Sequence, residues 1–203
     1  MPARGLGHGA GMRVYLAGPD VFLPDPVARG AALKAVCARH GLTGVFPLDP
    51  FEAAPVEWDA LPLARRIALG NEAHIRGADA LIANLTPFRG PSADAGTVFE
   101  LGFARALGRP VFGWSNTAVP FTERTVGFLG AQVARNPGGG WTDGDGLLVE
   151  SFGMSDNLMI DGAVLASGGM LSVHEAAADA RWSDLAAFER CVMAAARLLM
   201  PTR

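Results

Sequence analysis

Short apolar runs alternate regularly with longer helical stretches from Arg13 to Trp114. The first run ends at a glycine and the second runs into prolines, as buried strands do. The stretches between the runs carry apolar residues every three or four positions, as amphipathic helices do. Parallel strands need a crossover connection, usually a helix, so this alternation is typical of a parallel sheet covered by helices. The sequence therefore predicts an α/β domain.

The expected elements follow the chain in that order. Strands are predicted over residues 13–18, 44–50, 78–85 and 109–114, and helices over 27–40, 61–77, 97–107 and 182–200. Ser183 is the expected N-cap of the last helix. Residues 115–183 carry glycine-rich pieces between short apolar runs, so we expect long loops and a fifth strand there. The glycine-rich start predicts a disordered leader over 1–12, followed by a single domain over 13–203.

Composition narrows the range of partners. With 203 residues, of which 50% are hydrophobic and 18% charged, the chain is long enough to fold around its own core. The formal net charge of -3 lacks the positive excess by which proteins bind nucleic acids or anionic membranes. Small neutral ligands are the expected partners.

The cysteines and the apolar runs indicate in which cellular compartment the protein is expected. Cys37 and Cys191 lie far apart, without the spacing of a metal site, so we expect buried thiols in a reducing environment and no metal. No run approaches the length of a membrane span, and the first residues lack the apolar core of a signal peptide. A cytoplasmic protein without membrane contact is predicted.

In open parallel sheets, ligands bind beyond the carboxyl ends of the strands. Tyr15 and Gly18 are expected there from the first strand, and Asp94 and Glu100 after the third. Each has an ordinary structural explanation too. Thr97 and Glu100 fit a capping box, Asp94 fits an Asx-turn, and Tyr15 fits a core position.

Together these residues also suit glycosyl transfer. Cleavage at an anomeric carbon passes through an oxocarbenium-like transition state, which a carboxylate stabilises, and a second acidic group can assist the leaving base. We expect Glu100 to be held in its ionised form by the helix N-terminus and to act as nucleophile. Tyr15 would fix its rotamer, and Gly18 would let a sugar approach the backbone.

The order of the motifs points to a family. They are V-Y-L-A-G-P-D-V-F at 14–22, F-P-L-D at 46–49, the stretch from G-N-E-A-H-I-R-G to F-E-L-G-F-A at 70–104, G-R-P-V at 108–111 and, more weakly, S-D-N-L-M-I at 155–160. In order and spacing they resemble the nucleoside 2-deoxyribosyltransferases. The core of the resemblance spans Arg13 to Trp114.

The resemblance implies a flavodoxin-like, three-layer α/β/α fold with a mostly parallel five-stranded sheet. Its enzymes exchange the base of a 2'-deoxynucleoside for a free nucleobase through a covalent deoxyribosyl intermediate, without metal or cofactor. Glu100 matches the nucleophile, Asp94 the acid that contacts sugar or base, and Tyr15 the residue that orients the glutamate. Asn157 matches an asparagine supplied by a neighbouring subunit, which implies a homo-oligomer, a dimer or an assembly of dimers.

One position departs from the family pattern. Asn71 stands where several members carry an aspartate, with Glu72 beside it. An asparagine can hydrogen-bond the edge of a nucleobase, but it cannot supply a proton.

Several loop residues complete the predicted substrate site. Phe22 and Phe88 are expected either to pack on a base or simply to fill their loops. Arg89 either binds the base or a phosphate, or fixes its loop through carbonyls or an acid. Asp49 is a wall or a ligand contact, and Asn84, at the end of the third strand, is assigned to substrate binding. His74 is expected to be structural.

Three other functions remain open. With water as acceptor the same site would make a nucleoside or nucleotide N-glycosidase, although Asp20, expected at the entrance, would repel a phosphate. The phosphoribohydrolases that resemble lysine decarboxylase also place G-T-x-x-E at a helix start, but they have glycines where this chain has S-A-D-A. A non-catalytic nucleoside-binding module would need the acids only as hydrogen-bond acceptors.

Overall fold

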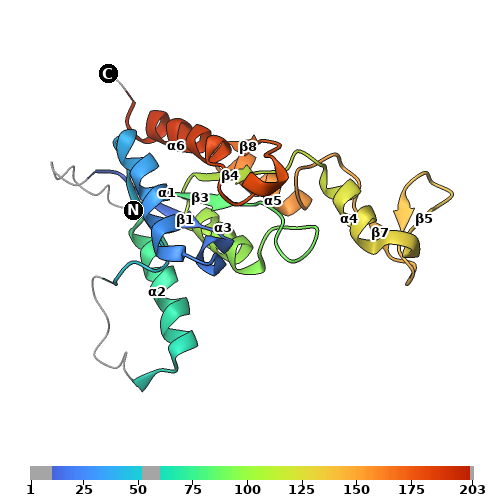
Figure 1. Cartoon of the computed structure of the whole chain (residues 1–203), viewed down its shortest axis with the longest axis horizontal. Helices are drawn as coiled ribbons and strands as arrows, with labels where there is room; N and C mark the ends of the chain where they lie inside the picture. Colours follow the sequence, from blue (N-terminus) through green and yellow to red (C-terminus); the bar gives the residue numbers. More distant parts are fainter. Residues whose placement is uncertain (1–10, 52–59, 202–203) are drawn as a thin grey trace.

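The computed structural model describes residues 11–51 and 60–201 (Figure 1). Its centre is a five-stranded sheet in the order β2-β1-β3-β4-β8, in which every neighbouring pair is parallel. The strands are β1 (Arg13–Ala17), β2 (Thr43–Val45), β3 (Ala80–Asn84), β4 (Val111–Ser115) and β8 (Leu171–Val173). This strand order is flavodoxin-like, so the predicted α/β class and five-stranded sheet are confirmed.

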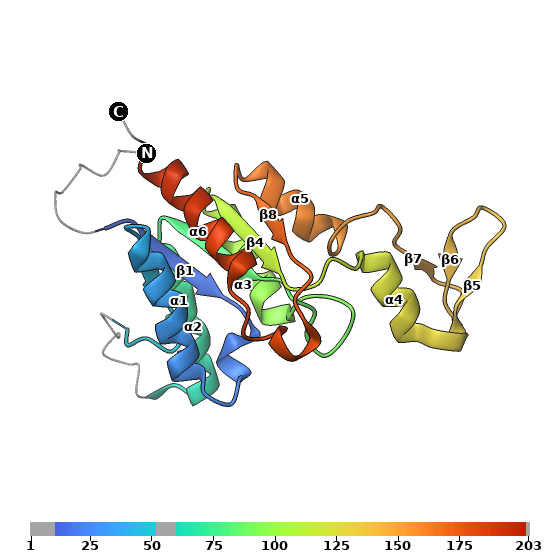
Figure 2. The same ribbon diagram turned by 45° about the horizontal axis from the view of Figure 1, so that its top comes forward.

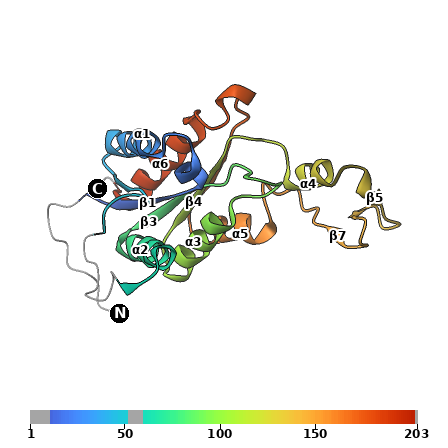
Figure 3. The same ribbon diagram turned by 60° about the horizontal axis from the view of Figure 1, so that its bottom comes forward.

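Helices cover both faces of this sheet (Figure 3). They are α1 (Pro26–Arg39) and α6 (Ala186–Leu199) on one face, and α2 (Leu63–Gly77), α3 (Ala95–Ala106) and α5 (Leu158–Ala166) on the other. Successive strand residues point to opposite faces. Leu16 therefore joins the core under α1 and α6, while its neighbour Tyr15 joins the core under α2, α3 and α5.

The strand order creates a crevice at one point of the sheet. From β1 the chain passes through α1 to β2 on one side, and then through α2 to β3 on the other side of β1. Connections that leave in opposite directions open a gap beyond the carboxyl ends of the two strands. Tyr15 lies in β1, and Glu100 lies in α3, which follows β3.

Some boundaries differ from the prediction. The strand expected over 44–50 is only three residues long, because Asp49 turns the chain back and accepts a hydrogen bond from the backbone N–H of Phe46. The last helix begins at Ala186, so Ser183 is not its cap. Instead the carboxylate of Asp184 accepts the backbone N–H of Ala186 at 2.7 Å.

Residues 121–150, here called the arm, lie in the region 115–183, for which the sequence predicts long loops and a fifth strand. They form α4 (Phe121–Leu129) and a small antiparallel sheet of β5 (Ala134–Arg135), β6 (Trp141–Thr142) and β7 (Leu148–Val149). Strands of two residues are too short to show alternation in a sequence. The arm extends away from the parallel sheet (Figures 1 and 2), and none of the residues of α4 is buried.

Short 3-10 helices complete the described chain, at Pro19–Phe22, Gly130–Gln132 and Ala178–Ala180. Cys37 and Cys191 are both buried free thiols, as predicted. Within residues 11–51 and 60–201, no helix is long and apolar enough to span a bilayer. Most of the predicted leader lies outside the described residues, but Met12 packs against the core and so belongs to the folded part.

Candidate active site

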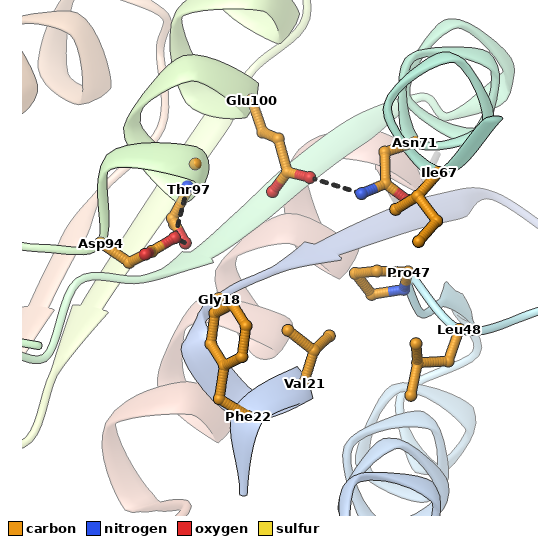
Figure 4. Close-up of a pocket in the computed structure, with 11 residues that line it drawn as sticks. Gly18, Val21, Phe22, Pro47, Leu48, Ile67, Asn71, Asp94, Thr97 and Glu100 are labelled. Carbon is orange, nitrogen blue, oxygen red and sulfur yellow. Dashed lines mark hydrogen bonds between the residues drawn. The ribbon is translucent and has the colours of Figure 1, made fainter. Parts of the chain in front are cut away.

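A hydrogen-bonded carboxylate lies at the crevice. The phenol of Tyr15, from β1, donates to Oε1 of Glu100 at 2.7 Å. Nδ2 of Asn71, from α2, donates to the same oxygen at 3.3 Å (Figure 4). Tyr15 is completely buried, so its ring has little freedom. Two elements, β1 and α2, therefore hold the side chain that α3 carries.

Glu100 lines a cavity of about 320 Å³, and the other labelled side chains of the crevice lie around the same space (Figure 4). Its lining residues are Gly18, Val21, Phe22, Pro47, Leu48, Ile67, Asn71, Asp94, Gly96, Thr97 and Glu100. The walls are thus mostly apolar, with a few polar side chains on the α2 and α3 side. A concave apolar site with a few convergent polar groups is the usual form of a small-molecule pocket.

Thr97 and Glu100 do not form the capping box that their spacing suggests. α3 begins at Ala95, and its N-cap is Asp94, whose Oδ2 accepts from the backbone N–H of Thr97 at 2.9 Å and from its hydroxyl at 3.0 Å. Glu100 lies beyond the first turn and points to Tyr15 and Asn71 instead. Asp94 is therefore the cap, and the glutamate is free for chemistry.

Burial controls the ionisation of Glu100. Desolvation raises its pKa to about 7, and the charge of Asp94 adds to that rise, while the hydrogen bonds from Tyr15 and Asn71 oppose it. The expectation that the helix N-terminus would favour the ionised form is therefore wrong, because Glu100 lies too far along α3. Burial also raises the pKa of Tyr15, so its hydroxyl remains a neutral donor.

Asn71 uses only one of its two polar side-chain atoms in the hydrogen bonds described. Nδ2 donates to Glu100, but Oδ1 is buried and has no hydrogen-bond partner among the described residues. A second hollow of about 240 Å³, between α2 and α3, is lined by Asn71, Gly96, Phe99 and Glu100 among others. Glu100 is therefore reached from two sides.

Position 18 has no room for a side chain, so a glycine is required there. A Cβ at this position would lie 2.8 Å from Cβ of Asn84, which is too close for any real contact. Asn84 itself is buried and does not line the cavity. It donates to Oδ2 of Asp20 at 2.8 Å and accepts from the backbone N–H of Thr86 at 3.1 Å, so it braces the turn after β1.

Asp20 is not an entrance acid. Only 2% of its surface is exposed, and Oδ1 accepts from Nε of Arg29 at 2.7 Å. The expectation that Asp20 would repel a phosphate is therefore wrong, because its charge is buried and neutralised.

The structure brings the predicted aromatic residues together at the rim. The rings of Phe22 and Phe88 stack with centroids 5.5 Å apart, and Phe22 also lines the cavity while 57% of it stays exposed. The guanidinium of Arg89 lies 5.3 Å from the ring of Phe22 and 4.6 Å from that of Phe88. Arg89 thus packs on aromatic rings rather than fixing its loop through carbonyls or an acid.

Asp49 and His74 support the wall of the cavity from behind. Asp49 accepts from Nζ of Lys34 at 2.6 Å and does not line the cavity, although its neighbours Pro47 and Leu48 do. A ring nitrogen of His74 lies 3.1 Å from the carbonyl oxygen of Asp49, and the ring packs beside that of Tyr15. His74 is structural, as predicted.

Asn157 lies elsewhere. It caps α5 by accepting from the backbone N–H of Met159, and its Nδ2 donates to Oε2 of Glu150 at 2.7 Å. It lines a separate, apolar groove of about 700 Å³ between α3 and α5. A chain therefore does not present its own Asn157 to the Glu100 cavity.

Sequence reasoning missed part of the wall. Val21, Leu48 and Ile67 line the cavity, and Leu48 and Ile67 are about half exposed. No local pattern marks them, since Ile67 reads as an ordinary apolar helix position. In the described part of the chain, no group of three or more His, Cys, Asp or Glu side chains is arranged to hold a metal ion.

Known proteins match both the sequence and the fold. The model of the nucleoside 2-deoxyribosyltransferase family matches residues 14–159. An uncharacterized protein of Schizosaccharomyces pombe is 31% identical over 169 residues, which cover 79% of this chain and 80% of that protein.

Two solved structures are similar to this one. The 2-desoxiribosyltransferase from Leishmania mexicana is 34% identical with a TM-score of 0.55, and the match covers 73% of this chain and 85% of that chain. A conserved protein of Enterococcus faecalis V583 is 20% identical with a TM-score of 0.51, covering 90% and 98% of the two chains, and at this identity it shows the fold alone.

Proposed function

This chain belongs to the nucleoside 2-deoxyribosyltransferase family, and we propose that it exchanges the base of a 2'-deoxynucleoside through a covalent deoxyribosyl–Glu100 intermediate. The observation that carries the proposal is the position of Glu100. Its carboxylate is held by Tyr15 and Asn71 at the wall of an open cavity large enough for a small ligand, with the carboxylate of Asp94 at the same wall.

In the first step, Glu100 attacks C1' of the sugar, and the bond from C1' to the base nitrogen breaks with its electron pair leaving on the base. Both hydrogen bonds described for the carboxylate fall on Oε1, so Oε2 is the oxygen left to attack. Asp94 uses Oδ2 to cap α3, so its other oxygen can contact the sugar or the leaving base. Asn71 can bind the base edge through Oδ1 but cannot protonate it.

In the second step, a ring nitrogen of the incoming base attacks C1', and the bond from C1' to Glu100 breaks with its electron pair returning to the carboxylate. The incoming base gives up its ring N–H proton to solvent, and this balances the proton that the departed base takes up from solvent. Each step inverts C1', so the net configuration is retained. The nucleophile must be ionised to attack, and a pKa of about 7 leaves a substantial ionised fraction at neutral pH.

Hydrolysis by the same site is the second candidate. One observation favours it: the hollow between α2 and α3 opens a further side of Glu100 through which water could reach C1'. Asp20 is buried and ion-paired, so no charge at that position excludes a 5'-phosphate from the substrate. Water in place of the base would make the chain an N-glycosidase of nucleosides or nucleotides. Free deoxyribose released without any acceptor base measures this activity.

The proposal includes a homo-oligomer. Asn157 and the cavity lie on different parts of one chain, so a partner subunit would have to supply this side chain to the sugar. A cytoplasmic role in base salvage remains a prediction.

The decisive experiment is mass spectrometry of the protein incubated with a deoxynucleoside or its 2-fluoro analogue, without acceptor base. We expect a deoxyribosyl adduct on Glu100 and none in Glu100→Gln. Incubation of deoxyinosine or thymidine with a panel of bases, followed by chromatography, then gives the acceptor range. A protein that binds deoxynucleosides equally well with Glu100→Gln, and forms neither adduct nor product, is a binding module instead.

A further inference from the structure

Asp156 is a buried carboxylate that takes no part in the proposed reaction. Only 1% of its surface is exposed. It lies just before α5, yet it binds the loop that precedes α3. Oδ2 accepts from the backbone N–H of Ala93 at 3.0 Å, and Oδ1 accepts from the hydroxyl of Ser92. Hydrogen bonds to a buried carboxylate are strong, because breaking one leaves part of a charge unpaired in the interior.

Arg124 binds the same loop from the base of the arm. Its Nε donates to the carbonyl of Pro91 at 2.7 Å, and its Nη2 donates to the carbonyl of Ser155 at 2.7 Å and lies 3.4 Å from Oδ2 of Asp156. The Arg124 side chain is only 9% exposed. Asp161, from α5, accepts the backbone N–H groups of Ser155 and Asp156 and so holds this segment on the other side.

The next residue after this clamped loop is Asp94. Its peptide nitrogen is one residue beyond the N–H that Asp156 holds, and its Oδ2 is already engaged by Thr97. The backbone of 91–93 therefore determines where Oδ1 of Asp94, the oxygen not bonded to Thr97, lies in the cavity. A loop held by a cation and a carboxylate from distant segments has little freedom to shift.

We propose that Asp156 and Arg124 are positioning residues that hold Asp94, and through Asp94 tune Glu100, an inference that rests on the base-exchange function proposed above. Neither residue lines the cavity. Arg124 belongs to α4, so the same side chain links the arm to the loop that precedes Asp94.

The link from Asp94 to Glu100 is electrostatic. Within residues 11–51 and 60–201, the ionisable groups that bond to Glu100 or line a hollow with it are Tyr15 from β1, Glu72 from α2, and Asp94 at the start of α3. The charge of Asp94 raises the pKa of Glu100. If the loop is released and Asp94 moves outward, the pKa of Glu100 falls.

If Asp156 had only a structural role, its substitution would give a different result. The substitution would lower stability, but its effect on kcat/KM and on the pKa of Glu100 would be the same with and without the Asp94 carboxylate. A double-mutant cycle separates the two roles, because coupled residues give non-additive effects and independent ones add.

The experiment compares Asp156→Asn in the parent chain and in an Asp94→Asn background. An asparagine keeps the size of Asp156 but presents an amide N–H₂ to groups that are themselves donors. Two quantities are measured: kcat/KM for base exchange, and the pKa of the Glu100 carboxyl by ¹³C NMR titration, assigned from its absence in Glu100→Gln. The titration needs no turnover, so it tests the positioning even if the chain does not exchange bases.

We expect Asp156→Asn to lower kcat/KM about 10- to 100-fold in the parent. It should also lower the pKa of Glu100 by on the order of half a pH unit, with little further change in the Asp94→Asn background. Arg124→Met should act in the same direction. Ser92→Ala, which removes one hydrogen bond to Asp156, is the milder variant if Asp156→Asn fails to fold, and we expect a smaller change of the same sign.

Asp79→Asn is the matched control. Asp79 accepts the backbone N–H of Arg13 at 2.8 Å, at the start of β3 and so at the opposite edge of the sheet. Its substitution should affect stability without moving the Glu100 titration. Equal effects of Asp156→Asn with and without the Asp94 carboxylate, or an unchanged Glu100 pKa in a folded Asp156 or Ser92 variant, would overturn the inference.

Discussion

The hydroxyl of Tyr15 lies 2.7 Å from Oε1 of Glu100, although the two residues are 85 positions apart. Tyr15 lies within β1 and Glu100 follows β3, and these strands are neighbours in the sheet. The contact therefore forms only when the parallel sheet does. It supplies the orientation of the carboxylate and also opposes the rise of its pKa.

Tyr15→Phe should weaken catalysis and shift its pH dependence. Without the hydroxyl, Glu100 loses a donor that favours its ionised form, so its pKa rises above about 7 and the acidic limb of kcat/KM moves to higher pH. Lost orientation should lower the plateau by about 10- to 100-fold. A pH–rate profile from 5 to 9 measures both, and an unmoved limb would contradict the assigned role.

Glu100→Gln should make the fold more stable at alkaline pH. Burial raises the pKa of Glu100 from 4.5 to about 7, so the folded chain holds this proton more tightly than the unfolded chain. The resulting stability is present below pH 4.5 and is lost as the pH rises to about 7. Glutamine does not ionise, so the variant should gain about 1–3 kcal/mol in free energy of unfolding at pH 8.

Urea titrations of parent and Glu100→Gln at pH 4.5 and pH 8 test this. The difference in free energy of unfolding should be small at the lower pH and favour the variant at the higher pH. Glu123→Gln, on the arm, is the control and should show no such pH-dependent gain. A variant less stable than the parent at pH 8 contradicts the assigned burial of the charge.

Phe22→Ala should raise the KM for the acceptor base about 10-fold, because stacking on an aromatic ring contributes about 1–3 kcal/mol per base. The effect on kcat should be smaller, since Phe22 lines the cavity as an exposed ring stacked on Phe88, with no hydrogen bond to Glu100. Phe128→Ala provides the comparison, because Phe128 is similarly exposed but lies on the arm. Steady-state kinetics at varied base concentration measure the KM for the acceptor base in both variants. Equal KM values for the two variants would rule out a stacking role for Phe22.

Asn157 allows a mixing experiment. If a partner subunit supplies it, Glu100→Gln and Asn157→Ala are each inactive, but a mixed dimer has one site with both native residues. Refolding an equal mixture should then restore about a quarter of the parent sites. No recovery in a mixture shown to contain mixed dimers would place the function of Asn157 within its own chain or outside the reaction.

The strands and the polar residues at their carboxyl ends could be predicted because their signals are local. Short apolar runs between helical stretches mark β1, β3 and β4, and parallel strands must bring their carboxyl ends to one edge. Tyr15, Asp94 and Glu100 therefore had to lie near one another. The arm escaped prediction because its strands are too short to carry a pattern.

Other outcomes depended on packing between distant segments. Thr97 and Glu100 have the spacing of a capping box, but Asp94 takes the cap, and Tyr15 and Asn71 draw the glutamate into the crevice. Asp20 reads as an exposed turn acid until Arg29 and Asn84 enclose it.

The local order of residues thus determined which elements form and where the polar side chains fall along them, because backbone preference and side-chain periodicity act over a few residues. Tertiary structure decided which of those side chains lose water, what they bond to and how readily they ionise. Desolvation and Coulomb interactions depend on distance in space, and for Glu100 that distance is spanned by residues from β1, α2 and the start of α3.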